Sequence, residues 1–280
     1  MNDAFCLNTA HATAHRADGV VELLQITDTH LFADKDTDLL GIATWHSCRA
    51  VVDAVRADPT PRDAILATGD LSQDHSPESY AHFTNLMSEL SPPVYWLPGN
   101  HDDAPVMQQM LELAGISDAK HLLFDHWQLL LLDTQLGGKV HGELSEGQLT
   151  LLEQAISQFP RHHLLVAVHH QAVPVGCAWL DQHDLKNAGA FRALLARHQA
   201  STAVLFGHVH QGFDEVHEGV RYLASPSTCI QFKPLSDEFA LDTTAPGWRA
   251  LSLYPDGRLS TQIWRLPPAT FVPDFSAKGY

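Results

Sequence analysis

Five short apolar runs in this chain each end in a group of Asp, Asn and His residues. The runs occupy residues 20–26, 64–68, 94–97, 163–168 and 202–206. A short run of Val, Leu and Ile that is followed by polar residues is typical of a strand buried on both faces. In open α/β sheets, ligands bind beyond the carboxyl ends of the strands. The pattern therefore predicts an α/β fold with one site at that edge.

The polar residues that follow the runs are chemically alike. They are Asp28, His30, Asp70, Asn100, His101, Asp102, His169, His208 and His210. Carboxylate, imidazole and amide oxygen groups suit divalent metals such as Mn, Fe and Zn. In the D-x-H and H-x-H motifs the two residues lie two apart, so extended backbone would place both side chains on one face. Glycines precede Asp70, Asn100 and His208, and we expect each to permit a tight turn.

None of these motifs is specific when it is taken alone. A D-x-H pair arises by chance in loops, an Asp after a Gly often caps a helix or turn, and a buried His is more often structural than a ligand. All five motifs follow apolar runs in one chain. That coincidence predicts a shared metal site rather than five unrelated turns.

Helical periodicity separates the predicted strands. Apolar residues recur at helical spacing within residues 46–56, 77–90, 104–114, 145–159 and 188–198. We expect Asp103 to cap the third of these helices, and Ser145 with Gln148 to form a capping box at the fourth. The segment around residues 125–127 and the Asp-Gly pair at 256–257 indicate hairpin turns.

The chain shows no internal repeat, low-complexity segment or linker-like change in composition. We therefore expect a single domain over residues 20–280, preceded by an N-terminal extension of residues 1–19. Residues 137–143 and 229–247 have loop-like composition and follow predicted strands. They are the segments that we expect to cover the site.

The charge of the chain excludes some functions. There are 17 Lys and Arg residues against 33 Asp and Glu, for a net charge of −16. Duplex nucleic acids and anionic membranes require a basic surface, so neither is expected as a partner. The 19 histidines outnumber the Lys and Arg residues. Surface composition accounts for some of them, and a metal site or proton transfer near neutral pH would account for others.

Cysteine usage and the N-terminal sequence favour a cytoplasmic protein. Cys6, Cys48, Cys177 and Cys229 form no C-x-x-C pair, which disfavours a zinc ribbon and indicates a reducing compartment. The first residues include neither a basic nor an apolar leader region, so no signal peptide is expected. The longest stretch without a charged residue, 162–180, holds four histidines and does not read as a membrane span.

The ordered motifs DTH, GDLSQD, GNHD, His169 and GHVH resemble those of the calcineurin-like metallophosphoesterase superfamily. The resemblance spans Asp28 to His210. Residues 169–189, 225–234 and 245–260 look like the corresponding segments of the bacterial cyclic-AMP phosphodiesterases in that superfamily. The resemblance implies a four-layer α/β/β/α sandwich with metal ions at the carboxyl ends of the strands.

The same resemblance implies a ligand set for two divalent metal ions. Asp28, His30, Asp70 and His210 would hold one ion. Asp70, Asn100, His169 and His208 would hold the other, so that Asp70 bridges the two. All seven positions match the family pattern. Fe and Mn are the expected metals, and Zn also suits this mixed ligation.

Two such metals can share a hydroxide that attacks a phosphodiester in line. The positive metal site would draw the phosphate despite the acidic surface. We expect His101 to contact the phosphate and to protonate the departing 3′ oxygen, with Asp74 as a candidate to orient it. His170 is either an outer-sphere residue or only a neighbour. The residues expected to surround the bound substrate are His30, Asp70, Asn100, His101 and His210.

The function that the sequence predicts is hydrolysis of 3′,5′-cyclic AMP to 5′-AMP. The alternative within enzymes is another phosphoesterase of the same fold, either a phosphatase or a broad cyclic-nucleotide diesterase. A metal-free binding scaffold is the alternative from another class, and the intact ligand set counts against it. Aromatic residues in or beside segment 229–247, namely Phe232, Phe239 and Trp248, could contact the base. The oligomeric state stays open.

Overall fold

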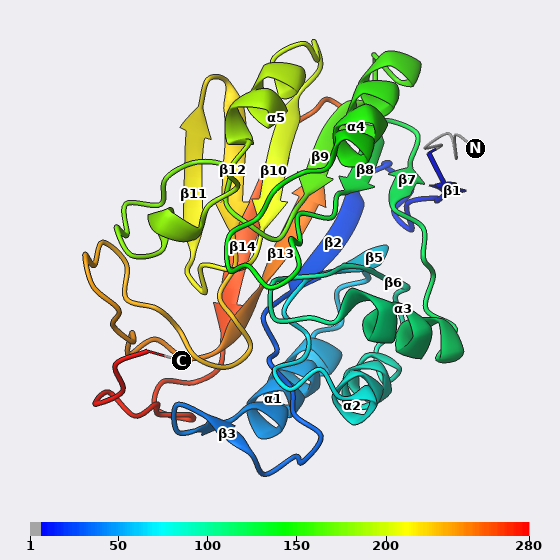
Figure 1. Cartoon of the computed structure of the whole chain (residues 1–280). Coiled ribbons are helices and arrows are strands. Elements are labelled where there is room, and N and C mark those ends of the chain that lie inside the picture. Colours follow the sequence, from blue (N-terminus) through cyan, green and yellow to red (C-terminus); the bar gives the residue numbers. More distant parts are fainter. Residues whose placement is uncertain (1–6, 280) are drawn as a thin grey trace.

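Two β-sheets form the centre of the computed structural model, which describes residues 7–279 (Figure 1). The seven-stranded sheet contains, in spatial order, β1 (Thr9–His11), β7 (His121–Leu123), β8 (Trp127–Leu131), β9 (His163–Ala167), β10 (Thr202–Phe206), β12 (Val220–Ala224) and β11 (Phe213–His217). The five-stranded sheet contains β14 (Leu259–Arg265), β13 (Gly247–Leu253), β2 (Val21–Ile26), β5 (Ala64–Thr68) and β6 (Val94–Leu97). A separate two-stranded ribbon pairs β3 (Asp38–Leu39) with β4 (Ile42–Ala43).

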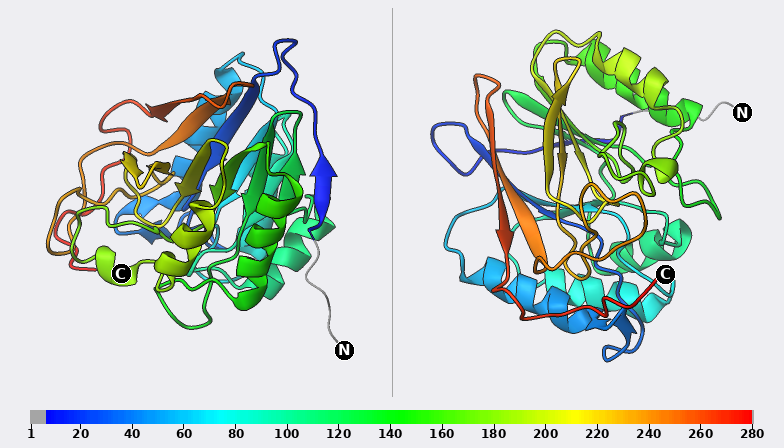
Figure 2. Two further views of the ribbon diagram at one scale, coloured as in Figure 1. Left: turned by 90° about the horizontal axis from the view of Figure 1, so that it is seen from above. Right: turned by 90° about the vertical axis from the view of Figure 1, so that its left-hand side faces the viewer.

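Helices cover the outer face of each sheet (Figures 1 and 2). The five-stranded sheet is covered by α1 (Thr44–Ala57), α2 (Pro77–Met87) and α3 (Ala104–Leu113). The seven-stranded sheet is covered by α4 (Glu146–Gln158) and α5 (Ala188–Leu195). Each helix overlaps the segment predicted for it, and the largest differences are three residues, at the ends of α2 and α5.

Three apolar clusters hold the layers together. One packs α1–α3 against the five-stranded sheet, one packs α4 and α5 against the other sheet, and the third lies between the sheets. Successive strand residues enter different clusters, because side chains alternate across a strand. Leu23 packs between the sheets and its neighbour Leu24 packs against helices. The predicted four-layer α/β/β/α sandwich is therefore confirmed.

The five predicted strands are β2, β5, β6, β9 and β10, and their bounds match the expected runs to within one residue. β2, β5 and β6 pair in parallel, and β8, β9 and β10 do so in the other sheet. Parallel pairing brings the carboxyl ends of neighbouring strands to one edge. The motif-bearing loops of both sheets therefore start from the same side of the sandwich.

Local signals at the helix and hairpin ends are mostly confirmed. Asp103 caps α3 by accepting from the backbone of Val106, and β7–β8 and β13–β14 are antiparallel hairpins. Ser145 caps α4 by accepting from the backbone N–H of Gln148. The capping box is only half formed, since the Gln148 side-chain oxygen accepts from the Asp133 N–H at 3.1 Å. A long-range partner has replaced the local one.

The N-terminal segment contributes to the sheet. Residues 9–11 form β1, which pairs in parallel with β7 at the edge of the seven-stranded sheet. Further along, the backbone N–H and Nδ1 of His15 both lie 2.6 Å from Asp63 Oδ1. The expected boundary at residue 20 therefore cuts through packed structure. A three-residue edge strand without an apolar run carries no sequence signal.

Cys48, Cys177 and Cys229 are buried free thiols, and Cys6 lies outside the described residues. None of the described helices is both long and apolar enough to cross a membrane. The cytoplasmic location stays a prediction from sequence.

Candidate metal centre and active site

The strand-end motifs adopt a backbone conformation that the sequence did not indicate. Positive φ angles occur at five predicted ligands: Asp28 (54°), His30 (45°), Asp70 (52°), His208 (65°) and His210 (47°). The D-x-H and H-x-H pairs therefore do not lie on extended strands, because β2 and β10 end before them. Left-handed turns instead direct both members of each pair inward. Asp and His tolerate this region better than most residues, and such strain is concentrated at functional sites.

The three preceding glycines have two different functions. Gly69 has a φ of 94° and makes the expected turn. Gly99 and Gly207 have no such φ, so their predicted role was wrong. A Cβ on Gly99 would lie 2.7 Å from the His169 ring, and one on Gly207 would lie 2.9 Å from Asp28 Oδ2. These two glycines therefore allow neighbouring loops to approach closely.

One group of donor atoms gathers around His30. Its Nε2 lies 3.2 Å from His210 Nε2 and 3.8 Å from Asp70 Oδ2. Asp28 Oδ1 lies 3.4 Å from the same His210 nitrogen. All four side chains are buried. Two imidazole nitrogens and two carboxylates at these separations form a donor set that suits a divalent cation.

A second group adjoins the first through Asp70. His169 Nε2 lies 3.2 Å from Asp70 Oδ2 and 3.2 Å from Asn100 Oδ1. The rings of His169 and His208 are 5.2 Å apart. Asp70 thus contacts residues of both groups, as expected for a bridging ligand. The fold brings all seven predicted ligands to one place.

Hydrogen bonds outside the centre set the histidine tautomers. Nδ1 lies 2.6 Å from Gln73 Oε1 in His30 and 2.8 Å from the Thr68 carbonyl in His169. In His210 it lies 3.0 Å from the Ile230 carbonyl. An oxygen of this kind accepts, so each Nδ1 carries a proton, and Nε2 is the nitrogen that would bind a metal. Metal-binding histidines are usually oriented in this way.

Two buried polar atoms at the centre have no hydrogen-bond partner among the described residues. They are Asp28 Oδ2 and His208 Nε2. Leaving such atoms unpaired costs about 1–3 kcal/mol each, and more for a charged carboxylate. A cation would satisfy both atoms. The residues present therefore fit a metal centre by their chemistry, their burial and their unmet bonding capacity.

The electrostatics of the centre also suit metal binding. Burial lowers the pKa of His30 to about 3, which keeps it in the neutral form that binds metals. Burial also lowers the pKa of His169, but the charge of Asp70 outweighs it and raises that pKa to about 9. A cation near Asp70 would compensate the same carboxylate and displace this proton.

His170 lies beside the centre, and both of its ring nitrogens are used elsewhere. Nδ1 lies 2.7 Å from Thr134 Oγ1, and Nε2 lies 3.0 Å from the Val140 carbonyl. A Cβ on Gly142 would strike this ring. His170 therefore supports the loop at residues 137–143, and Val140 of this loop lines the pocket beside the centre.

His101 faces the same centre from the loop after β6. Its backbone N–H donates to Asp70 Oδ1 at 2.8 Å, and its ring stands edge-on to His30 at 5.0 Å. The expected helper Asp74 accepts instead from Ala33 N at 2.7 Å and from Ser76 Oγ at 2.7 Å. Asp74 therefore orders the loop after Asp70.

Sequence reasoning assigned no function to two residues that hold these loops. Asp102 is buried and accepts from the backbone N–H groups of Leu71, Ser72 and Gly99, which joins the loops after β5 and β6. Gln73 anchors His30. Both lie inside the quoted motifs GNHD and GDLSQD, but their roles depend on contacts about thirty or more residues away in sequence.

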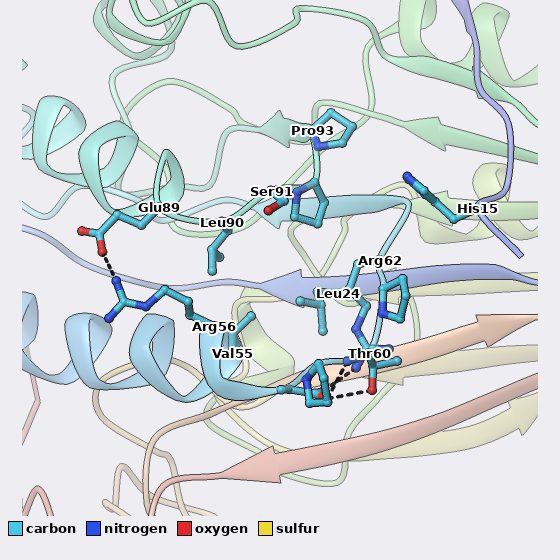
Figure 3. A pocket seen from close by; sticks show the side chains of 14 residues that line it. His15, Leu24, Val55, Arg56, Thr60, Arg62, Glu89, Leu90, Ser91 and Pro93 are labelled. Atoms are coloured by element: carbon cyan, nitrogen blue, oxygen red, sulfur yellow. Dashed lines mark hydrogen bonds and ion pairs between the residues drawn. The ribbon is translucent and has the colours of Figure 1, made fainter.

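A pocket of about 280 Å³ opens from this centre. Asn100, His101 and His208 are among the residues that line it. A second pocket of about 420 Å³ lies at the opposite edge of the five-stranded sheet, among loops that precede β5 and β6 (Figure 3). None of the predicted site residues lines it.

Comparison with known proteins places these observations in a family. The sequence profile of the calcineurin-like phosphoesterases matches residues 21–212. A 3′,5′-cyclic adenosine monophosphate phosphodiesterase of Escherichia coli (strain K12) is 49% identical over 261 residues, which covers 93% of this chain and 95% of that protein. A 3′,5′-cyclic-nucleotide phosphodiesterase of Nostoc is 39% identical, covering 88% of this chain and 93% of the relative.

Solved structures resemble the fold at low sequence identity. A dimetal phosphatase from Danio rerio superposes with a TM-score of 0.57 at 16% identity, covering 88% of this chain and 98% of that one. A Plasmodium protein described as the anchor in the inner membrane complex reaches 0.57 at 11% identity, covering 88% and 84%. These similarities support the fold alone, because one fold hosts many functions.

Proposed function

The chain belongs to the calcineurin-like phosphoesterase family, and we propose that it hydrolyses 3′,5′-cyclic AMP to 5′-AMP. The observation that carries the proposal is the 43–49% identity, over at least 93% of the chain, to proteins named cyclic AMP phosphodiesterases. The convergence of the seven predicted ligands at one centre supports it. Family membership implies a dinuclear site for divalent metal ions.

We infer that Asp28, His30, Asp70 and His210 hold one ion, and that Asp70, Asn100, His169 and His208 hold the other. Mixed imidazole and carboxylate ligation favours Fe or Mn and also admits Zn. Bound ions would neutralise phosphoryl charge and supply a nucleophile by lowering the pKa of water. The chain of net charge −16 would otherwise repel the phosphodiester.

The protein side chains position the phosphate and handle the proton. Asn100 and His101 line the pocket beside the centre, and we infer that they surround the bound phosphate together with His30, Asp70 and His210. Hydrolysis forms one bond from water oxygen to phosphorus and breaks the bond from phosphorus to the 3′ oxygen. In this proposal His101 donates the proton that the departing 3′ oxygen takes up. Its backbone contact with Asp70 holds it beside the centre.

Turnover of a substrate panel tests the proposal. The metal-loaded enzyme is assayed with cyclic AMP, cyclic GMP, a 2′,3′-cyclic nucleotide and an aryl phosphomonoester. We expect the highest kcat/KM for cyclic AMP, with 5′-AMP as the product. Preference for the monoester would identify a phosphatase, and similar rates for all cyclic nucleotides would identify a broad diesterase. No turnover by a protein that retains two metals would indicate a scaffold.

A further inference from the structure

The pocket beside the metal centre is lined by two chemically different groups of residues. Asn100, His101 and His208 belong to the polar group. Trp179, Phe232 and Phe239 also line the pocket, and we call these three residues the aromatic wall. Among the described residues that line the pocket there is no Asp, Glu, Lys or Arg. The pocket therefore offers a ligand both predicted metal ligands and an uncharged aromatic surface.

The three aromatic rings form one connected group. The Trp179 ring lies 4.9 Å from Phe232 and 5.2 Å from Phe239, both in edge-to-face geometry. Phe232 is buried and stacks on the imidazole of His210 at 4.4 Å, with an interplanar angle of 19°. Phe232 thus joins the wall to a predicted metal ligand. Trp179 is only partly buried, which leaves part of its ring available to a ligand.

Two loops from different parts of the chain hold the wall in place. Segment 229–247 folds back on itself, with Lys233 N–H donating to the Ala240 carbonyl at 2.8 Å. In the loop after β9, the Asp181 carboxylate accepts from Val175 N–H at 2.8 Å. The Cys177 thiol joins the two loops by donating to the Ser236 carbonyl at 3.1 Å. These contacts make the wall a formed part of the fold.

We propose that the aromatic wall is the subsite for the nucleobase, and that Trp179 is its specificity-determining residue. The inference rests on the proposed function, because it assumes a phosphodiester whose leaving group carries a purine. A neutral, planar base matches an uncharged aromatic surface, whereas a sugar or a second phosphate would lose hydration without gaining partners. Trp179 Nε1 is buried and donates to none of the described residues. A ring nitrogen of the base would accept from it.

Binding of two ligands that differ only in the base tests the subsite without turnover. The metal-loaded enzyme is titrated by calorimetry with 5′-AMP and with ribose 5-phosphate. We expect the wild type to bind 5′-AMP at least about ten-fold more tightly, which is within the range measured for stacking of one base on an aromatic side chain. In Trp179→Leu this ratio should approach one, while the affinity for ribose 5-phosphate stays unchanged.

A second variant separates the indole N–H from the ring. Trp179→Phe keeps an aromatic face, so we expect it to retain part of the preference for 5′-AMP. Trp264→Leu, which alters a half-exposed tryptophan on β14, is the matched control and should preserve the full ratio.

Several outcomes would overturn the subsite. They are a wild-type ratio near one, an unchanged ratio in Trp179→Leu, or equal weakening of both ligands in that variant. Failure of the proposed function looks different. The wild type would then bind 5′-AMP through its base and yet fail to hydrolyse cyclic AMP in the substrate panel.

Discussion

The two pockets at opposite edges of the five-stranded sheet differ in how their charges are satisfied. The pocket of Figure 3 is the larger, at about 420 Å³ against 280 Å³. Its arginines are already paired. Arg56 bonds to Asp53 and Glu89 at 2.6 Å, and Arg62 bonds to Asp58 at 2.8 Å. The smaller pocket opens onto a centre where Asp28 Oδ2 and His208 Nε2 have no hydrogen-bond partner within residues 7–279.

This difference shows that volume is a poor guide to function. At the amino ends of β5 and β6 the proline-rich loops enclose space, but each guanidinium has its carboxylate. At the carboxyl ends, strained loops bring buried donor atoms together without satisfying them. Unpaired buried groups cost stability, so a protein retains them where a ligand recovers that cost. The contrast can be tested by changing one group at a time at each edge.

The largest effect is expected from Asp70→Ala, which removes the residue shared by both ligand groups. We expect loss of at least part of the metal and a fall in activity greater than the ~10–100-fold typical of losing an outer-sphere partner. Asp58→Asn removes a carboxylate from the pocket of Figure 3 and should leave both properties unchanged. Elemental analysis measures the bound metal, and cyclic AMP turnover measures the activity. Two metals retained with normal turnover in Asp70→Ala would refute the bridge.

His101→Ala tests proton transfer separately from metal binding. We expect both metals to remain and kcat for cyclic AMP to fall by ~10²–10⁴-fold, the usual contribution of a general acid. KM should change little, because the contribution is made only in the transition state. The nitrophenolate of a nitrophenyl phosphodiester departs without a proton. The loss of kcat for that substrate should therefore be smaller. Equal losses for both esters would assign His101 to phosphate positioning, and loss of metal would make it a structural support.

Gln73→Leu tests whether the outer hydrogen bonds orient the metal ligands. The substitution removes the acceptor for His30 Nδ1, which lies 2.6 Å away. We expect metal affinity to fall by ~10–100-fold, as is typical when such a partner is lost. Competition with a metal chelator measures this affinity, and excess metal should restore turnover. An unchanged affinity would mean that packing alone orients His30.

The smallest effect is expected at Lys120, a partly buried cation that forms no ion pair among the described residues. Burial lowers its pKa from 10.5 to about 7. The unfolded chain therefore binds more protons between these values, and the wild type should gain stability as the pH rises through that window. Lys120→Met should raise the free energy of unfolding at about pH 6, and this increase should be smaller at about pH 9.

Urea denaturation at the two pH values measures this change. The hydrogen bond from Lys120 to the Trp96 carbonyl, at 2.6 Å, is lost at every pH, so only the difference between the two conditions reports on the charge. A gain that does not vary with pH would show that the ammonium is well solvated in the folded protein.

Much of this fold could be predicted because its signals are local. Apolar runs identified β2, β5, β6, β9 and β10, the polar residues after them identified candidate ligands, and the family resemblance implied the set of seven. Two kinds of feature could not be predicted from local sequence. β1 is three residues long and depends on pairing with β7. The Gln148 side chain accepts from the Asp133 backbone N–H instead of from its own helix terminus, because this part-buried donor, distant in sequence, competes with the local capping box.

The sequence by itself determined the positions of the main strands and the chemistry of the centre, whereas the four-layer order was implied by the family resemblance. Alternating burial along each strand and the residue types after it are local properties, and parallel pairing carries them to one edge. Tertiary structure alone decided how the donor atoms meet. The left-handed turns at Asp28 and His210 and the contact of Gly99 with His169 depend on loops distant in sequence. The aromatic wall joins Trp179 to Phe232 and Phe239 in the same way. Local sequence patterns do not predict such contacts, because the contacts are stabilised by surfaces that meet only after the sheets have packed.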